Sequence, residues 1–252
     1  MLIRSLLSLL FLSVAGQAAT LTFEASKDNS LYEDTLGGLS NGSGPTFFAG
    51  NTLGGVGSRT RRGLIEFDLS VIPSGSIIHS VVLDLYLVQA QSFPTDVGLH
   101  EVLAEWGEGT SSAGNRGGGG TAATANDATW LHTFFNGTFW AGAGGDFVAA
   151  ASATSVIGGE GVSYEWTSTA ALVADVQGWV DAPATNHGWL LRGDESQGGT
   201  AKAFATREDS NEARQPSLTV TFTPVPEPQT WLTLLGGLGL LLQMRPRHRA
   251  RS

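Results

Sequence analysis

Apolar residues at every second position are the feature that most constrains the fold of this chain. Within 63–69 the odd-numbered residues from Ile65 to Leu69 are apolar, while Glu66 and Asp68 are acidic. Within 80–88 the odd-numbered residues from Val81 to Leu87 are again apolar. A period of two residues predicts a half-buried β-strand. Pro73-Ser74-Gly75 lies between the two segments and predicts a turn.

Further short strands are predicted at 162–166, 189–191 and 217–222, each bounded by Gly, Pro, Asn or Asp. Only the segment around Leu172–Val180 has apolar residues at helical spacing, which predicts one short helix. Many short strands must each bury one face against a second sheet. We therefore expect an all-β fold, an antiparallel jelly-roll β-sandwich with one short helix, over residues 19–223.

The N-terminus has the pattern of a secretory signal. Arg4 precedes an apolar run from Leu6 to Val14, and Gly16-Gln17-Ala18 supplies small residues for cleavage near Ala18 or Ala19. Residues 1–18 are therefore predicted to be a signal peptide, and the protein to be exported. An uncleaved anchor is the alternative, although the apolar run is shorter than the ~20 residues that span a bilayer.

The C-terminal segment 224–252 has three parts in a fixed order. A Pro-Glu-Pro triplet precedes 16 uncharged residues, which predict a single hydrophobic helix, and an arginine cluster follows. As a helix these 16 residues would extend about 24 Å, which is marginal for a membrane span. The residues of the two charged or turn-forming parts are Pro226, Glu227, Pro228, Arg245, Arg247 and Arg249.

This tail resembles a PEP-CTERM sorting signal. The resemblance implies recognition by an exosortase-type membrane protease in a Gram-negative bacterium that makes exopolysaccharide. The protein would be held at the inner membrane through its C-terminal helix and then reach the cell surface or the extracellular matrix. A plain C-terminal anchor is the alternative.

A second resemblance covers most of the body. The run Arg62–Gly75, the strand 82–87, Trp106-Gly107-Glu108, the segment 186–191, Thr206-Arg207-Glu208 and the closing 216–220 resemble a DNRLRE domain in order and spacing. The resemblance implies a sandwich related to carbohydrate-binding modules, some of which bind acidic polysaccharides. His187 and the Gly-rich insertion 107–161 depart from the pattern, so ligand specificity does not transfer with the fold.

Charge excludes one class of partner. The chain has a net charge of −9, and residues 19–223 hold 22 acidic against 9 basic side chains. Such a surface repels phosphate backbones, so no nucleic-acid partner is expected. Acidic surfaces attract divalent cations, and carboxylates are ligands that Ca²⁺ prefers. The chain has no cysteine, which excludes disulfides and thiolate chemistry.

The insertion carries the candidate sugar-binding residues. Trp130 and Trp140 supply flat apolar faces for pyranose rings, and Asn126 and Asp127 supply polar groups for hydroxyls. Binding residues are often on loops of a rigid scaffold. The alternative is that the loop aromatics pack onto the sheet, since a loop this long needs its own small core.

A Ca²⁺ site is the one cofactor that the sequence suggests. Asp146, Asp194 and Glu195 are the candidate ligands, although no Asp-x-Asp-x-Asp-Gly loop is present. The alternative is that these carboxylates are solvated and bind nothing.

Catalytic patterns are weak. The segment 38–42 matches Gly-x-Ser-x-Gly but lacks the strand and helix that make a nucleophile elbow. The five histidines are scattered, so no zinc hydrolase is indicated. We therefore expect no enzyme, but a surface or matrix protein that binds polysaccharide, preferably acidic. A structural matrix or adhesion protein without glycan affinity is the main alternative, and an accessory domain with retained lyase or hydrolase activity is the third class.

Overall fold

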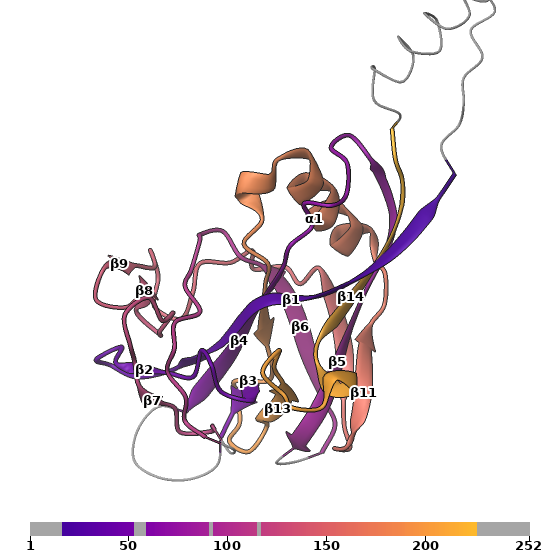
Figure 1. Ribbon diagram of the computed structural model, residues 1–252. Coiled ribbons are helices and arrows are strands. Elements are labelled where there is room, and N and C mark those ends of the chain that lie inside the picture. The colour runs from indigo at the N-terminus through magenta and orange to yellow at the C-terminus, as the bar shows by residue number, and fades with distance from the viewer. Residues whose placement is uncertain (1–16, 53–58, 91–92, 115–116, 226–252) are drawn as a thin grey trace, which may run out of the picture.

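The sheets of this protein are antiparallel throughout, and their pairings close a ring. The computed structural model describes residues 17–52, 59–90, 93–114 and 117–225 (Figure 1). Six strands pair in the order β1, β14, β5, β13, β3 and β4, and β4 pairs again with β1. The ring is extended by β11 beside β5, and by β12, β6 and β10 beyond β4. The bounds of these strands are β1 Ala19–Tyr32, β3 Thr46–Asn51, β4 Thr60–Phe67, β5 Ile77–Ala90, β6 Thr95–Glu101, β10 Ala153–Ile157, β11 Val162–Trp166, β12 Trp189–Arg192, β13 Lys202–Ala205 and β14 Ser217–Thr223.

Four short strands form two small ribbons outside the ring. They pair β2 (Leu39–Ser40) with β7 (Thr121–Ala122), and β8 (His132–Phe134) with β9 (Thr138–Phe139). Figure 1 shows both ribbons on the side of the molecule opposite β11. The all-β prediction is confirmed, as are the strands expected at 63–69, 80–88, 162–166, 189–191 and 217–222, to within a few residues at their ends.

Alternating residues of the long strands build the core. Val81, Leu83, Leu85 and Leu87 of β5 are all fully buried, and Leu218 and Val220 of β14 lie against the same interior. Each such side chain contributes roughly 1.5–3 kcal/mol when it leaves water. The two-residue period therefore decides which face of each strand turns inward.

The one α-helix of the described chain, α1 (Ala170–Asp181), covers an end of the strands, as the sequence predicted. Thr169 begins it as N-cap, because its Oγ1 accepts from the backbone N–H of Leu172 at 3.0 Å. Trp179 packs against Trp189 of β12 with ring centroids 4.5 Å apart. Two 3₁₀ turns, η1 (Pro183–Thr185) and η2 (Glu212–Arg214), complete the helical residues of the described part of the chain.

Strand β1 crosses from one set of neighbours to another. Ala19–Glu24 pair with β14, whereas Ala25–Tyr32 pair with β4, with a bulge between Ala25 and Lys27. A bulge bends a strand and increases its twist, which suits this change of partner. The second half of β1 buries polar side chains, which alternation alone would place outside.

Several expected segments lie outside the described residues. These are most of the signal peptide 1–18, the hydrophobic helix of 224–252, and the sorting residues Pro226, Glu227, Pro228, Arg245, Arg247 and Arg249. Among the residues that the structure describes, no helix has both the length and the apolar character needed to cross a membrane.

Candidate functional site

The insertion that follows β6 has a small core of its own. Trp140 is 5% exposed, and its indole N–H donates to the carbonyl of Thr129 at 2.9 Å. It packs in a cluster with Trp106 and residues of β1, β4 and β12. The structure therefore places Trp140 in the interior, as the packing alternative expected, and its ring face is not presented to a sugar.

The other three predicted sugar-binding residues differ in exposure. Asp127 is fully buried, and its Oδ2 accepts from the backbone N–H of Thr124 at 2.5 Å. Trp130 is half-buried, with the guanidinium of Arg62 4.9 Å from the centre of its ring. Asn126 is exposed and has a left-handed backbone, φ 69°. The four residues do not form one binding surface.

The predicted Ca²⁺ ligands each have partners of their own. Asp146 accepts from the backbone N–H groups of Ala141 and Gly142, at 2.7 and 2.9 Å. Asp194 accepts from the N–H and hydroxyl of Ser196.

Glu195 is held by two arginines. It pairs with Arg62 at 2.7 Å and with Arg192 at 3.2 Å. Burial acts to raise the pKa of Glu195, but the hydrogen bonds and charges of the two arginines lower it overall. The structure therefore does not bring Asp146, Asp194 and Glu195 together as a ligand set.

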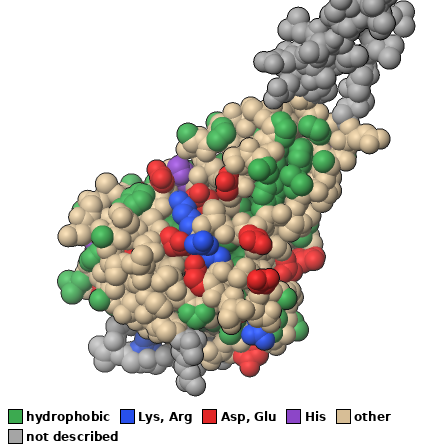
Figure 2. All heavy atoms as spheres, in the orientation of Figure 1, with side chains coloured by type: hydrophobic (Ala, Val, Ile, Leu, Met, Phe, Trp, Pro, Cys, Tyr) green, Lys and Arg blue, Asp and Glu red, His purple; other side chains and the backbone are tan. Residues whose placement is uncertain are grey.

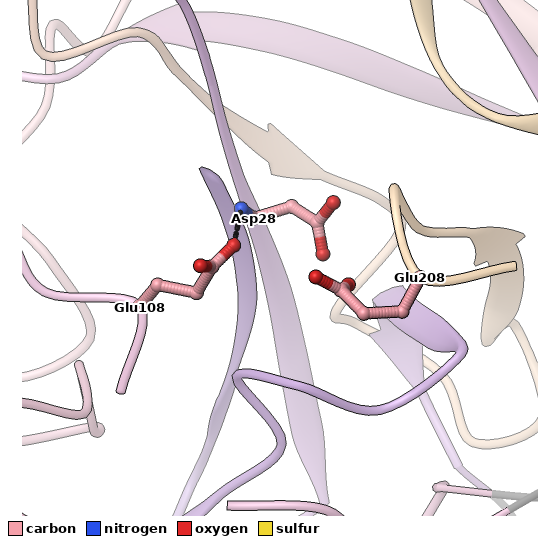
Figure 3. A group of neighbouring side chains, drawn as sticks. All are labelled: Asp28, Glu108 and Glu208. Carbon is pink, nitrogen blue, oxygen red and sulfur yellow. Dashed lines mark hydrogen bonds between the residues drawn. The ribbon is translucent and has the colours of Figure 1, made fainter. Parts of the chain in front are cut away.

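A different acidic cluster forms where three distant segments meet. Asp28 on β1, Glu108 in the loop after β6 and Glu208 after β13 place carboxylate oxygens within 4.8 Å of one another (Figure 3). Asp28 is fully buried, and the other two are half-buried. We call these three residues the acidic triad. Figure 2 shows acidic and basic side chains gathered across the face that β1 crosses.

Backbone contacts fix each member of the acidic triad. The N–H of Asp28 donates to Oε1 of Glu108 at 2.9 Å, and the side chain of Asn29 donates to the carbonyl of Glu108 at 2.9 Å. The N–H of Arg207 donates to Oδ2 of Asp28, also at 2.9 Å. The hydroxyl of Thr206 donates to the carbonyl of Gly44 and so ties the third segment down.

The acidic triad is electrostatically unbalanced. Burial raises the pKa of Asp28 well above its usual range, and the charges of Glu208 and Glu108 act in the same direction. Burial likewise raises the pKa of Glu208. Arg207 lies 2.8 Å from Glu108 and 3.3 Å from Glu208, and its side chain is 40% exposed. The ionised forms of Asp28 and Glu208 are therefore disfavoured with Arg207 as their neighbouring cation.

No metal-ligand spacing in the sequence marks the acidic triad. Its members are about eighty and one hundred residues apart, although Glu108 and Glu208 lie in two of the segments that carry the family resemblance. The one local sign is Lys27-Asp28-Asn29-Ser30, a polar run inside a strand. Its meaning depends on contacts that only the fold creates.

A groove beside α1 is the second feature with room for a ligand. It has a volume of about 370 Å³, within the range of small-molecule sites. Its polar lining includes three serine hydroxyls, two carboxylates and an amide, which belong to Ser26, Ser70, Ser74, Glu66, Asp68 and Asn186. We call it the α1 groove.

The floor of the α1 groove is apolar, formed by Leu69, Ile72, Val180 and other residues packed on the core. The pKa values of its two carboxyl groups are shifted in opposite directions. Burial raises the pKa of Glu66, against the opposing charge of Lys27 2.9 Å away. Hydrogen bonds from Ser70 lower the pKa of Asp68. A lining that mixes polar groups with apolar side chains is typical of small-molecule sites.

The segment 38–42, which matches a nucleophile-elbow pattern, is part of the interior. Ser40 is fully buried, and its hydroxyl donates to Asn29 at 3.0 Å and to the carbonyl of Ala128 at 2.9 Å. Its neighbour Asn41 donates to the carbonyl of Thr46. Ser40 therefore supports the polar half of β1.

Comparison of this chain with protein-family models and with curated proteins finds no match.

Proposed function

We propose that this chain is an exported, non-catalytic protein of the cell surface or extracellular matrix that binds polysaccharide in an exopolysaccharide setting. The single observation that carries the binding proposal is the α1 groove, with its hydroxyl, amide and carboxylate lining above an apolar floor. The tail 224–252 supports sorting by an exosortase-type protease, and the resemblance to DNRLRE domains supports a jelly-roll arrangement of the strands.

The charge of the groove bears on the polymer. Glu66 and Asp68 disfavour an anionic sugar at this position, so the groove itself suits uncharged units. An acidic polymer, which the family resemblance implies, would need a cation between it and the protein. A panel of neutral and anionic polysaccharides therefore distinguishes the two polymer classes.

The test is binding of residues 19–223 to that panel, with a variant that fills the groove. Ser74 lines the groove and is exposed, so Ser74→Trp should abolish saturable binding while the protein stays folded. Ser163→Trp, at an exposed position on β11 outside the groove, is the matched control and should bind normally. Unchanged binding by Ser74→Trp would show that the groove is not the site.

The same preparations test the absence of catalysis. A carboxyl with a raised pKa beside one with a lowered pKa is the pairing that glycosidases use, and Glu66 and Asp68 share the groove. Release of reducing ends from any polymer, lost in Glu66→Gln, would replace the binding proposal with a hydrolase.

A structural matrix or adhesion protein without glycan affinity is the second candidate. The burial of Trp140 and Asp127 favours it, because two of the expected sugar contacts serve the fold instead. This role predicts concentration-dependent self-association in light scattering and no saturable binding to any polysaccharide.

A further inference from the structure

Asp28 carries a buried oxygen that has no hydrogen-bond partner among the described residues. Its Oδ2 accepts from Arg207, but its Oδ1 is buried without a hydrogen bond, on a side chain that is 0% exposed. Oε2 of Glu208 is also buried and unpartnered. Figure 3 shows the carboxylates of Asp28 and Glu208 turned toward each other. Leaving a buried carboxylate oxygen unpaired is costly, so the arrangement favours a positive species, either a proton or a bound cation, between the two carboxyl groups.

The net charge of the acidic triad also favours a bound cation. Among the described residues, the ion pairs of the three carboxylates are all made by Arg207, which contacts Glu108 and Glu208. With all three ionised, three negative charges face one positive charge. A divalent cation in place of the guanidinium would leave a smaller net charge than Arg207 does.

We propose that Asp28, Glu108 and Glu208 form a Ca²⁺ site, and that Arg207 occupies it as a competing counter-ion when the metal is absent. The ligands are all oxygens, which favours a hard cation over zinc or copper. They come from three separate segments and leave one side open, because Glu108 and Glu208 are only half-buried. Ca²⁺ accepts such irregular sets of six to eight oxygens, including waters, whereas Mg²⁺ demands a near-ideal octahedron.

Competition follows from the position of the guanidinium. Arg207 Nη1 lies 2.8 Å from Oε2 of Glu108 and 3.3 Å from Oε1 of Glu208, so it pairs with two of the three carboxylates that the metal would bind. A dication bound to these carboxylates at about 2.3–2.6 Å would repel it. The side chain of Arg207 is 40% exposed, so it can turn into solvent while its backbone N–H keeps its bond to Asp28.

The experiment is calorimetric titration of the purified, chelator-treated protein with CaCl₂, and separately with MgCl₂. Wild type should bind one Ca²⁺ and bind Mg²⁺ more weakly. Asp28→Asn keeps the shape and the acceptor for Arg207, and it should weaken Ca²⁺ binding at least tenfold. Asp96→Asn removes an exposed carboxylate on β6 and is the matched control, with unchanged affinity.

A second variant changes affinity in the opposite direction. Arg207→Gln removes the competing cation and retains the backbone N–H, so it should bind Ca²⁺ more tightly than wild type. Circular dichroism of every variant establishes that it is folded. Absence of Ca²⁺ binding in wild type, or full affinity in Asp28→Asn, would overturn the site. Weaker binding in Arg207→Gln would overturn the counter-ion role. This inference is independent of the α1 groove, because none of these Ca²⁺-binding measurements involves a polysaccharide.

Discussion

The indole N–H of Trp140 donates to the carbonyl oxygen of Thr129 from a ring that is 95% shielded from solvent. The ring thus fills the core of the insertion, whereas Trp130 lies half-exposed against Arg62.

Trp140→Ala is expected to destabilise the protein by about 3–5 kcal/mol, because it leaves a cavity and an unpaired carbonyl. Trp130→Ala should cost clearly less. Urea denaturation of both variants measures the difference. Equal losses would mean that Trp140 is not part of the core in solution.

Removal of Ca²⁺ should destabilise the protein if the acidic triad holds the metal. At a hundredfold excess over its dissociation constant, a ligand of the native state adds about 2.7 kcal/mol. Urea unfolding with CaCl₂ and with chelator measures this increment in wild type. Asp28→Asn should unfold at the same urea concentration in both conditions. A chelator effect of equal size in Asp28→Asn would contradict the site.

Stability should fall below about pH 6.5 through His100. Burial lowers the pKa of His100, whose ring contacts the carbonyl of Val148 at 2.9 Å. Between the lowered folded pKa and the unfolded pKa of about 6.5, the unfolded chain binds more protons. Acid therefore favours unfolding in that interval. Denaturation midpoints of wild type and His100→Gln against pH should converge as the pH falls; parallel curves would exclude this contribution.

Glycine is required at position 42. A Cβ atom there would lie 1.6 Å from the carbonyl oxygen of Glu108, whereas one at Gly38 would come no nearer than 3.9 Å to Asp34. Gly42→Ala should cost roughly 1–3 kcal/mol by overpacking and should weaken Ca²⁺ binding by displacing Glu108. Gly38→Ala is the control from the same loop. Thermal unfolding and Ca²⁺ titration measure both effects, and normal behaviour of Gly42→Ala would show that the backbone of Glu108 yields easily.

Processing of the tail is tested in a host with an exosortase. If the Pro226–Pro228 triplet is a sorting motif, replacement of Glu227 should leave full-length precursor in the membrane fraction. Mature wild-type protein should lack Arg245, Arg247 and Arg249. Mass spectrometry of both forms gives the result, and normal maturation of the Glu227 variant would contradict the sorting proposal.

The fold was largely predictable where packing is simple. In β5 the burial of alternate residues from Val81 to Leu87 follows directly from their two-residue period. The second half of β1 was not predictable, because its buried polar residues depend on distant partners. Asp28 and Asn29 bond to Glu108 of the insertion, and the hydroxyl of Ser30 accepts from the backbone N–H of Phe48. A polar run indicates a loop when its distant hydrogen-bond partners are not known.

The sequence indicated which kinds of ligand the candidate sites could bind, but not which residues form them. Acidic composition suggested a divalent cation, but Asp146 and Asp194 are bonded within their own loops and Glu195 pairs with Arg62. Asp28, Glu108 and Glu208 meet instead where β1 and two distant loops come together. Likewise Trp140 and Trp130 are equivalent in the sequence. The ring that fits the space above β1 and β4 is buried, and only tertiary structure decides which one that is.

The pairing of Ala19 with Phe222 determines how the body would respond to a pull on its C-terminal segment. The chain enters β1 and leaves β14 side by side, at the end of the molecule away from the β2–β7 ribbon (Figure 1). A pull on the segment after Thr223, resisted by something bound to the body, would load the β14 hydrogen bonds to β1 and β5 along the strand direction. Many hydrogen bonds would then share the load at once. The folded body would therefore resist a pulling force better than a domain whose last strand is peeled away one hydrogen bond at a time.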